Sequence, residues 1–382
     1  MSGRGTISRL LAKPEALTVE WADGAVGEFA SLWLRDNLPE NRDPHSGQRL
    51  IDVADLPERP RIRAAAVRGD SLCIEWESEP RPASIDLGWL ASQAGGAGDQ
   101  HPAAIARPWL RGASLDASRD FAHASFGEFH GDRRLRLAWL TRLLKDGVAF
   151  LGALPSNRAA ILEAVRPMGR VLETNYGLVF DVRSVPQPEN LAYSDLGLGL
   201  HTDNPYREPV PGFQALHALR CSPDGGDSLF ADGWALADHL RATDPEAFAL
   251  LTRTPVPFQY RSKDAELYAE RPLIQLSCRD DVCAVHYNSR SIAPLHLPAR
   301  DCAAFYTAYR RFAMLLRDAQ YQLKCRLADG DLVVFDNQRI LHGRTAYSAA
   351  THARHLRGCY LTRDSVHSET ALLRRSLDGE PR

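Results

Sequence analysis

The stretch Leu332-Val-Val-Phe-Asp-Asn-Gln-Arg-Ile-Leu-His342 predicts a strand and a turn that can return His342 to an earlier motif, His201-Thr202-Asp203. Residues i and i+2 of a strand point to the same side, so His201 and Asp203 can reach one ion. With His342 as third ligand, two imidazoles and one carboxylate form the facial triad of non-heme iron(II) oxygenases, which leaves positions open for a chelating cosubstrate and O2. The spacing alone is weak, because a chain with 13 histidines offers many such combinations.

Two further motifs favour this hypothesis. Arg354 lies in His352-Ala-Arg-His-Leu-Arg-Gly-Cys-Tyr360, one strand beyond His342. A guanidinium at that place can pair through two hydrogen bonds with the remote carboxylate of a dicarboxylate. The motif Gly225-Gly-Asp-Ser228 adds a hydroxyl at the start of another strand.

Composition excludes several classes of protein. The chain has 382 residues, with 46 Lys and Arg against 48 Asp and Glu and a formal charge of −2. This balance argues against general nucleic-acid binding, which needs a basic excess. No apolar run is long enough to predict a membrane span, and the first residues do not resemble a secretory signal. The seven cysteines contain no CxxC pair, which suits a reducing compartment, so we expect a soluble cytoplasmic protein.

The pattern changes along the chain. Up to residue 110, short alternating runs such as Leu72-Cys-Ile-Glu-Trp76 lie between Pro and Gly clusters, which predicts a small β-rich domain. Residues 91–104 are predicted to be a loop or linker, and the second domain is placed at 111–382. Its strands and inserted helices do not alternate regularly, which favours an α+β or barrel-like domain that is mainly β. Strands are predicted at 178–182, 212–219, 228–231, 284–287 and 332–335, and helices at 234–240, 245–251 and 301–318.

The ordered motifs resemble a known family. They are similar to the γ-butyrobetaine dioxygenase branch of the taurine dioxygenase-like, 2-oxoglutarate-dependent oxygenases, over about residues 15–375. The resemblance implies a double-stranded β-helix (jelly roll) with inserted helices, preceded by a small β-rich domain, and a homodimer. It rests on His201-Thr-Asp-Asn-Pro-Tyr, Pro211-Gly-Phe-Gln-Ala-Leu-His, Gly225-Gly-Asp-Ser, Phe335-Asp-Asn-Gln-Arg-Ile-Leu-His-Gly-Arg and Arg354-His-Leu-Arg-Gly-Cys-Tyr, with Trp33-Leu-Arg-Asp-Asn and Gly47-Gln-Arg in the first domain.

The resemblance also implies roles for single residues. Fe(II) would be held by His201, Asp203 and His342, and 2-oxoglutarate by Arg354 with help from Ser228. Members of the family bind trimethylammonium substrates in an aromatic cage, because π faces attract a cation that has no hydrogen-bond donor. Ordinary core packing is the alternative for each aromatic residue. The matching positions are Tyr176, Phe180, Tyr193 and Tyr360 for the cage, and Asn190 for the acidic end of the substrate.

This chain departs from the family pattern at two places. Relatives with a structural zinc carry cysteines just after Trp-Leu-Arg-Asp-Asn, whereas Leu38-Pro-Glu-Asn-Arg-Asp-Pro-His45 has none, so no structural zinc is expected. Where carboxylate-binding relatives use asparagine, the chain reads Tyr287-Asn288-Ser289-Arg290, and Arg207 follows the metal motif. An added guanidinium suits a more highly charged anion such as a phosphonate. Alternatively, Arg207 and Arg290 face solvent or pair with a structural carboxylate.

The sequence therefore predicts an Fe(II)- and 2-oxoglutarate-dependent hydroxylase of a small trimethylammonium zwitterion, with Asn288, Ser289 and Arg290 near its anionic end. Three alternatives stay open. The substrate could be a trimethylammonium phosphonate. The chain could be a non-catalytic betaine-binding protein, or it could hydroxylate a sulfonate or another small acid without a cage. The expected partner is a small molecule, with no nucleic acid and no membrane.

Overall fold

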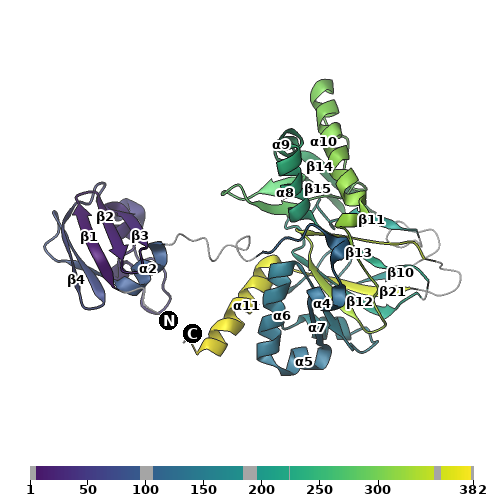
Figure 1. Ribbon diagram of the computed structural model, residues 1–382, viewed down its shortest axis with the longest axis horizontal. Helices are drawn as coiled ribbons and strands as arrows, with labels where there is room; N and C mark the ends of the chain where they lie inside the picture. The colour runs from purple at the N-terminus through teal and green to yellow at the C-terminus, as the bar shows by residue number, and fades with distance from the viewer. Residues whose placement is uncertain (1–5, 95–105, 184–195, 223, 348–353, 380–382) are drawn as a thin grey trace. The chain divides into compact units, whose positions relative to one another are not determined.

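The computed structural model describes residues 6–94, 106–183, 196–222, 224–347 and 354–379. The chain divides into two compact units, Met1–Ala104 and Ile105–Arg382, which are described separately (Figure 1). The domain boundary at 110 stays a prediction, a few residues beyond this division. No helix in the described part of the chain is long and apolar enough to cross a membrane.

The first unit contains two antiparallel three-stranded sheets. The central strands, β2 and β5, bury every second residue, as a sheet with one face on a core requires. The ring of Trp33 stacks on Phe29 and Trp89 at centroid distances of 5.2 and 5.7 Å. The elements are β1 (Ile7–Lys13), β2 (Ala16–Trp21), β3 (Val26–Ala30), α1 (Ser31–Asp36), short 3-10 turns at Pro39–Asn41 and Val53–Asp55, β4 (Ile62–Arg68), β5 (Ser71–Trp76), β6 (Ala83–Asp86) and α2 (Leu87–Ala94).

The sequence predicts a strand at 72–76 and a linker at 91–104 in this unit. The alternating run at 72–76 lies in β5. The linker predicted from residue 91 is wrong at its beginning, because residues 91–94 complete α2, where Leu90 and Ala91 are buried in the core. The remainder of that stretch lies outside the described residues.

The second unit is built on two sheets. The larger sheet has the order β10-β21-β12-β19-β8-β7, with β9 also paired to β21, and the smaller one has the order β11-β20-β13-β18. All pairs are antiparallel except β7 with β8. The strands are β7 (Ala122–Ser125), β8 (Val148–Gly152), β9 (Val171–Leu172), β10 (Phe180–Arg183), β11 (Leu198–His201), β12 (Phe213–Arg220), β13 (Ser228–Asp232), β18 (Leu323–Cys325), β19 (Leu332–Asp336), β20 (Ile340–Arg344) and β21 (His355–Leu361).

Strand β19 shows how the core is divided. All five of its residues are buried. Leu332 and Val334 join a core with helix residues such as Trp139 of α6, whereas Val333 and Phe335 join a core with Phe230 of the smaller sheet. The larger sheet is therefore covered by helices on one face and by the smaller sheet on the other, which explains why its strands are apolar on both sides.

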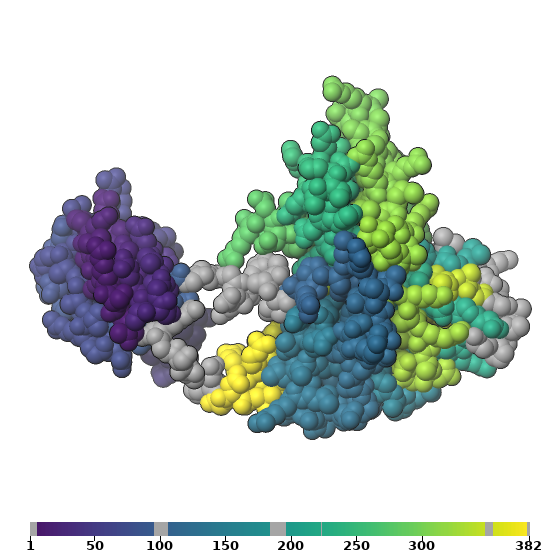
Figure 2. Space-filling view, viewed as in Figure 1, coloured from purple at the N-terminus to yellow at the C-terminus, as the bar shows by residue number. Residues whose placement is uncertain are grey.

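Helices cover this unit in two groups. In the first group, α6 and α11 lie side by side (Figure 1). The second group, α8 to α10 with the hairpin β14–β15, projects from the rest of the unit (Figure 2). The bounds are α4 (Ala117–Asp120), α5 (Phe126–Gly131), α6 (Arg133–Asp146), α7 (Ala160–Val165), α8 (Gly233–Thr243), α9 (Pro245–Arg253), β14 (Val256–Arg261), β15 (Glu266–Arg271), β16 (Ile274–Leu276), β17 (Val282–Val285), α10 (Ala299–Arg317) and α11 (Arg363–Asp378), with short 3-10 turns at Gly112–Ser114 and Ala319–Tyr321.

The unit is mainly β with inserted helices, as the sequence predicts. The strands predicted from 178, 212, 228, 284 and 332 overlap β10, β12, β13, β17 and β19, and the three predicted helices overlap α8, α9 and α10. Local chemistry accounts for the helix ends. Asp132 caps α6 by accepting hydrogen bonds from the backbone N–H groups of Arg134 and Leu135, and Gly147 ends it with a left-handed φ of 80°.

Candidate active site

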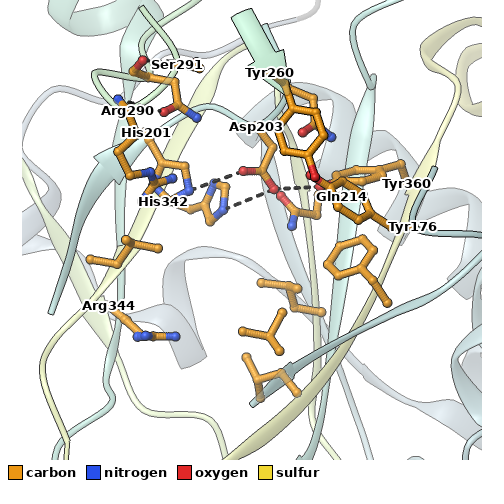
Figure 3. Close-up of a pocket in the computed structure, with 18 of the residues that line it drawn as sticks. Tyr176, His201, Asp203, Gln214, Tyr260, Arg290, Ser291, His342, Arg344 and Tyr360 are labelled. Carbon is orange, nitrogen blue, oxygen red and sulfur yellow. Dashed lines mark hydrogen bonds and ion pairs between the residues drawn. The ribbon is translucent and has the colours of Figure 1, made fainter. Parts of the chain in front are cut away.

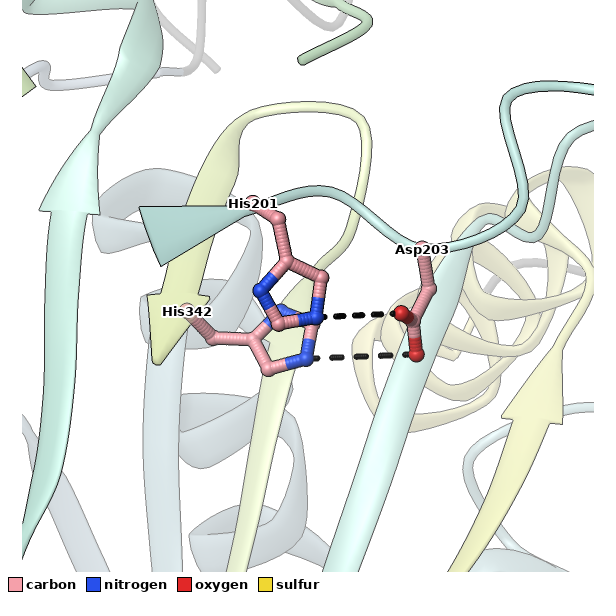
Figure 4. Close-up of side chains that lie close together, drawn as sticks. All are labelled: His201, Asp203 and His342. Atoms are coloured by element: carbon pink, nitrogen blue, oxygen red, sulfur yellow. Dashed lines mark ion pairs between the residues drawn. The ribbon is translucent and has the colours of Figure 1, made fainter. Parts of the chain in front are cut away.

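The predicted metal ligands come together at the edge of the smaller sheet. His201 is the last residue of β11 and pairs in register with His342 of β20, with ring centroids 4.3 Å apart. Asp203 lies just beyond the end of β11, with Oδ1 3.3 Å from His201 Nε2 and Oδ2 3.9 Å from His342 Nε2 (Figure 4). One ligand atom of each residue lies within 4.8 Å of the others. Among the described residues, this is the group of His, Cys, Asp and Glu side chains placed to hold a metal ion.

The protonation of these side chains suits a divalent cation. His201 Nδ1 lies 2.9 Å from the carbonyl oxygen of Gly199, so Nδ1 is assigned as the donor there, and Nε2 is the nitrogen that faces Asp203. Burial lowers the pKa of His342 to about 3, with smaller effects from His201 and Arg290, so its imidazole is neutral. Burial tends to raise the pKa of Asp203, but hydrogen bonds from His201 and Tyr360 and the charge of the two histidines hold it below its ordinary value. Two imidazole side chains and one carboxylate fit a first-row divalent metal such as Fe(II).

Neighbouring side chains fix Asp203 at two points. The amide of the fully buried Asn337 accepts a hydrogen bond from the backbone N–H of Asp203 (2.7 Å) and donates one to its carbonyl oxygen (3.0 Å). Tyr360 donates its hydroxyl to Asp203 Oδ2 at 2.8 Å. Asn337 lies in the turn between β19 and β20, so the segment that leads to His342 also holds the backbone of Asp203.

A cavity of about 410 Å³ opens beside the triad (Figure 3). It is lined by residues of β10, β12 and β21 from the larger sheet and of β11, β13 and β20 from the smaller one, together with residues of β14 and of the segment after β17. The cavity thus lies between the two sheets, and the triad forms part of its wall.

One part of the cavity wall is basic. Arg354 is 5% exposed and lines the cavity together with Ser228 and Arg344. Burial and the charge of Arg344 lower the pKa of Arg354 to about 10, and among the described residues no carboxylate forms an ion pair with it. A Cβ at Gly226 would lie 3.1 Å from Cδ of Arg354, so this glycine (φ +73°) gives the side chain its space. A buried guanidinium without a carboxylate of its own suits an anionic ligand.

Another part of the wall is aromatic. Tyr176, Phe180 and Tyr360 line the cavity as predicted positions for the cage, with ring centroids 6.4 Å apart for Tyr176 and Phe180 and 5.0 Å apart for Phe180 and Tyr360. A Cβ at Gly358 would lie 2.4 Å from the Phe180 ring, so the ring rests directly on the backbone of β21. The other two predicted positions at this end, Asn190 and Tyr193, lie outside the described residues.

Two tyrosines that the sequence analysis gave no role extend this cluster. The rings of Tyr206 and Tyr260 stack at 5.2 Å, and Tyr260 lies 6.0 Å from Tyr176. The Tyr206 hydroxyl donates to Asn204 Oδ1 at 2.6 Å. Tyr206 is part of the quoted metal motif, so its position was a usable signal. Tyr260 comes from the hairpin β14–β15, and its strand pattern does not indicate which cavity it reaches.

Gln214, in the motif Pro211-Gly-Phe-Gln-Ala-Leu-His, also reaches the cavity. It is buried on β12, lines the cavity, and its Oε1 has no hydrogen-bond partner in the described structure.

The residues predicted near the anionic end separate into two groups. Asn288 and Arg290 line the cavity, as does Ser291. Asn288 is held by a hydrogen bond from Nδ2 to the carbonyl oxygen of Thr202 (3.0 Å). Ser289 is exposed and does not line the cavity, so the structure does not bring it to the predicted place.

Arg207 does not line the cavity either. Its guanidinium lies over the rings of Tyr176 and Tyr206, at 5.7 and 5.8 Å, and donates to Asn175. In the first unit, His45 is exposed. The absence of a structural zinc there stays a prediction.

Comparisons with known proteins agree with this site. The model of the family described as "Taurine catabolism dioxygenase TauD, TfdA family" matches residues 115–360, so the chain belongs to this family. It is 34% identical over 366 residues to the gamma-butyrobetaine dioxygenase of Pseudomonas sp. (strain AK-1), covering 94% of each chain, which confirms the predicted resemblance. The gamma-butyrobetaine dioxygenase of Homo sapiens is 26% identical over 376 residues, covering 95% of each. Among solved structures, PvcB of Pseudomonas aeruginosa is 20% identical with a TM-score of 0.46, over 64% of this chain and 83% of that one.

Proposed function

We propose that this chain is an Fe(II)- and 2-oxoglutarate-dependent hydroxylase of a small trimethylammonium zwitterion. The observation that carries the proposal is a His-Asp-His triad in the wall of one cavity that also contains a buried arginine and a cluster of aromatic rings. Similarity to gamma-butyrobetaine dioxygenases over nearly the whole chain supports the substrate class. We further propose that the two sheets of the second unit are those of a double-stranded β-helix (jelly roll), that residues 1–110 form a separate β-rich domain, and that the protein is a homodimer.

Each part of the cavity has a task in this proposal. His201, Asp203 and His342 would hold Fe(II), and Arg354 with Ser228 would bind the remote carboxylate of 2-oxoglutarate. When bound, iron and 2-oxoglutarate supply the oxidising power to insert an oxygen atom from O2 into a C–H bond.

The chain's own residues then decide which C–H bond reacts. Aromatic rings such as Tyr176, Phe180 and Tyr360 would bind the cationic end and exclude water. Asn288 and Arg290 would hold the anionic end. Binding at both ends fixes one carbon next to the metal, and this orientation is the protein's contribution to rate and selectivity.

Turnover with a panel of substrates tests the proposal. Purified protein is titrated with Fe(II) and 2-oxoglutarate without O2, and succinate formation is then measured in air with trimethylammonium carboxylates, phosphonates and sulfonates. We expect one zwitterion to stimulate succinate formation. Binding without turnover would indicate a non-catalytic betaine-binding protein. Turnover of a sulfonate that lacks the cation would show that the aromatic residues do not form a cation cage.

A trimethylammonium phosphonate is the second candidate substrate, because Arg290 lines the cavity within electrostatic reach of the triad. A guanidinium binds a dianion more strongly than a monoanion. Arg290→Ala should therefore raise the KM for a phosphonate far more than the KM for a carboxylate, and Arg290→Lys should restore part of the loss. Equal losses for both substrates would exclude a role for Arg290 in choosing the anion.

A further inference from the structure

Tyr360 connects two parts of the cavity wall that have different chemistry. It lies on β21 of the larger sheet, where its Cα pairs with those of Gln214 and Leu172 on the neighbouring strands, and it is 4% exposed. Its hydroxyl crosses to the loop that follows β11 of the smaller sheet and donates to Asp203 Oδ2 at 2.8 Å (Figure 3). One side chain therefore links the two sheets at the predicted metal ligand.

The ring and the hydroxyl of Tyr360 make separate contacts. The ring lies 5.0 Å from the ring of Phe180 and lines the cavity, so it belongs to the aromatic cluster. The hydroxyl is used by Asp203. By contrast, the hydroxyl of Tyr176, in the same cluster, lies 3.5 Å from the hydroxyl of Tyr206.

The orientation of the Asp203 carboxylate depends on this hydrogen bond. It lies beyond the end of β11, outside the regular sheet, and Asn337 fixes only its backbone. Rotation about the terminal bond of a carboxylate is soft, so the plane of the carboxylate depends on its partners. With Oδ1 directed toward His201, a hydroxyl on Oδ2 sets that plane. Removing a hydrogen-bonding partner of a metal ligand typically weakens metal binding roughly 10- to 100-fold.

We propose that Tyr360, whose ring already belongs to the proposed cation site, is also a positioning residue for the metal ligand Asp203 through its hydroxyl. This inference rests on the proposed function, because it takes the triad as the metal site. It assigns two roles to one side chain, and the roles depend on different atoms. Replacement of Tyr360 by Phe or by Leu therefore separates them.

Metal binding tests the hydroxyl. Mn(II) is titrated into the full-length protein and free Mn(II) is followed by its EPR signal. Tyr360→Phe should weaken Mn(II) binding about tenfold, and Tyr176→Phe, which removes the same atom from the same cluster, should leave the Mn(II) affinity within about twofold. Thermal melting checks that both variants fold. Should Tyr360→Phe fail to fold, Tyr360→Met, which fills the same place without a hydrogen-bond donor, is expected to show the same loss.

Cation binding tests the ring. Tetramethylammonium is titrated calorimetrically into protein saturated with Mn(II). Tyr360→Phe should bind it nearly as well as the wild type, whereas Tyr360→Leu should bind it about tenfold more weakly. Weak binding by Tyr360→Phe equal to that of Tyr360→Leu would contradict the separation of roles.

The outcomes also separate this inference from the proposed function. If Mn(II) binds the wild type and Tyr360→Phe equally well, the positioning role is wrong, and the metal site stands. If His201→Ala binds Mn(II) as well as the wild type, the triad is not the metal site, and both proposals fall.

Discussion

The two units of the chain bury different kinds of side chain. In the first unit the described core consists of aliphatic and aromatic residues, and the buried polar side chains are Ser31 and Asn41. The second unit also buries arginines, histidines and carboxylates. Burial of charge is costly unless it is compensated, so these groups need either a partner in the chain or a ligand.

Two arginines of the second unit show both cases. Arg339, 1% exposed, is paired with the buried Asp232 at 2.7 Å and donates to the carbonyl oxygens of Lys145 and Arg107. Arg354 lines the cavity, and the described residues provide it with no ion pair. A buried charge that is satisfied within the chain is therefore structural, whereas one directed at a cavity indicates a ligand.

The largest expected effect is that of removing a metal ligand. His201→Ala should weaken Mn(II) binding more than about 100-fold and abolish turnover, because two ligands do not hold a divalent ion well in water. His45→Ala, at an exposed histidine of the first unit, is the control and should bind Mn(II) as the wild type does. If His201→Ala binds Mn(II) as well as the wild type, the triad is not the metal site.

Replacing Arg339, the arginine that is paired within the chain, should lower the stability of the protein. Arg339→Leu leaves Asp232 buried without its partner, so the free energy of unfolding should fall by about 3–5 kcal/mol in urea titrations. The matched change in the first unit, Arg63→Leu, breaks an exposed ion pair with Glu75 and should cost less than about 1 kcal/mol. Equal costs would show that burial does not distinguish the two pairs.

Replacing Arg354, which has no ion pair among the described residues, should instead weaken the binding of 2-oxoglutarate. Arg354→Leu should weaken 2-oxoglutarate binding by about 2–3 kcal/mol, because a charge-assisted bidentate pair is lost. The free energy of unfolding without ligand should change little, since the described residues give Arg354 no carboxylate. Calorimetric titration and urea unfolding measure the two quantities. A large loss of stability with unchanged 2-oxoglutarate affinity would reverse the roles assigned to Arg339 and Arg354.

A smaller effect is expected from pH. Burial, with the charge of Arg271, lowers the pKa of His286 from 6.5 to about 3. The unfolded chain therefore takes up a proton at this residue as pH falls below 6.5, while the folded chain does not, so stability decreases from there toward about pH 3. The loss reaches on the order of 2 kcal/mol at about pH 5. His286→Gln should make the free energy of unfolding less dependent on pH over this range, and an unchanged dependence would contradict the assignment.

Much of the fold and of the triad follows from local pattern. The alternation in β5 depends on neighbouring residues, so the sequence predicts this strand. The triad also has a local part, since His201 and Asp203 lie two residues apart, and a motif of the family adds His342.

The remaining features depend on contacts between distant segments. Tyr260 reaches the cavity only because the hairpin β14–β15 folds over it, and nothing in Val256–Arg261 indicates that direction. The hydrogen bond from Tyr360 to Asp203 joins residues 157 positions apart on different sheets. Ser289 is the opposite case, because its neighbours Asn288 and Arg290 line the cavity whereas Ser289 is exposed and is not part of the lining.

The most direct test of the central claim is succinate formation by the wild-type protein with Fe(II), 2-oxoglutarate and O2, measured with and without each trimethylammonium zwitterion. We predict that one zwitterion stimulates succinate formation, that hydroxylated product appears in equal amount, and that His201→Ala forms neither. Succinate formation that no zwitterion stimulates, or equal turnover in His201→Ala, would contradict it.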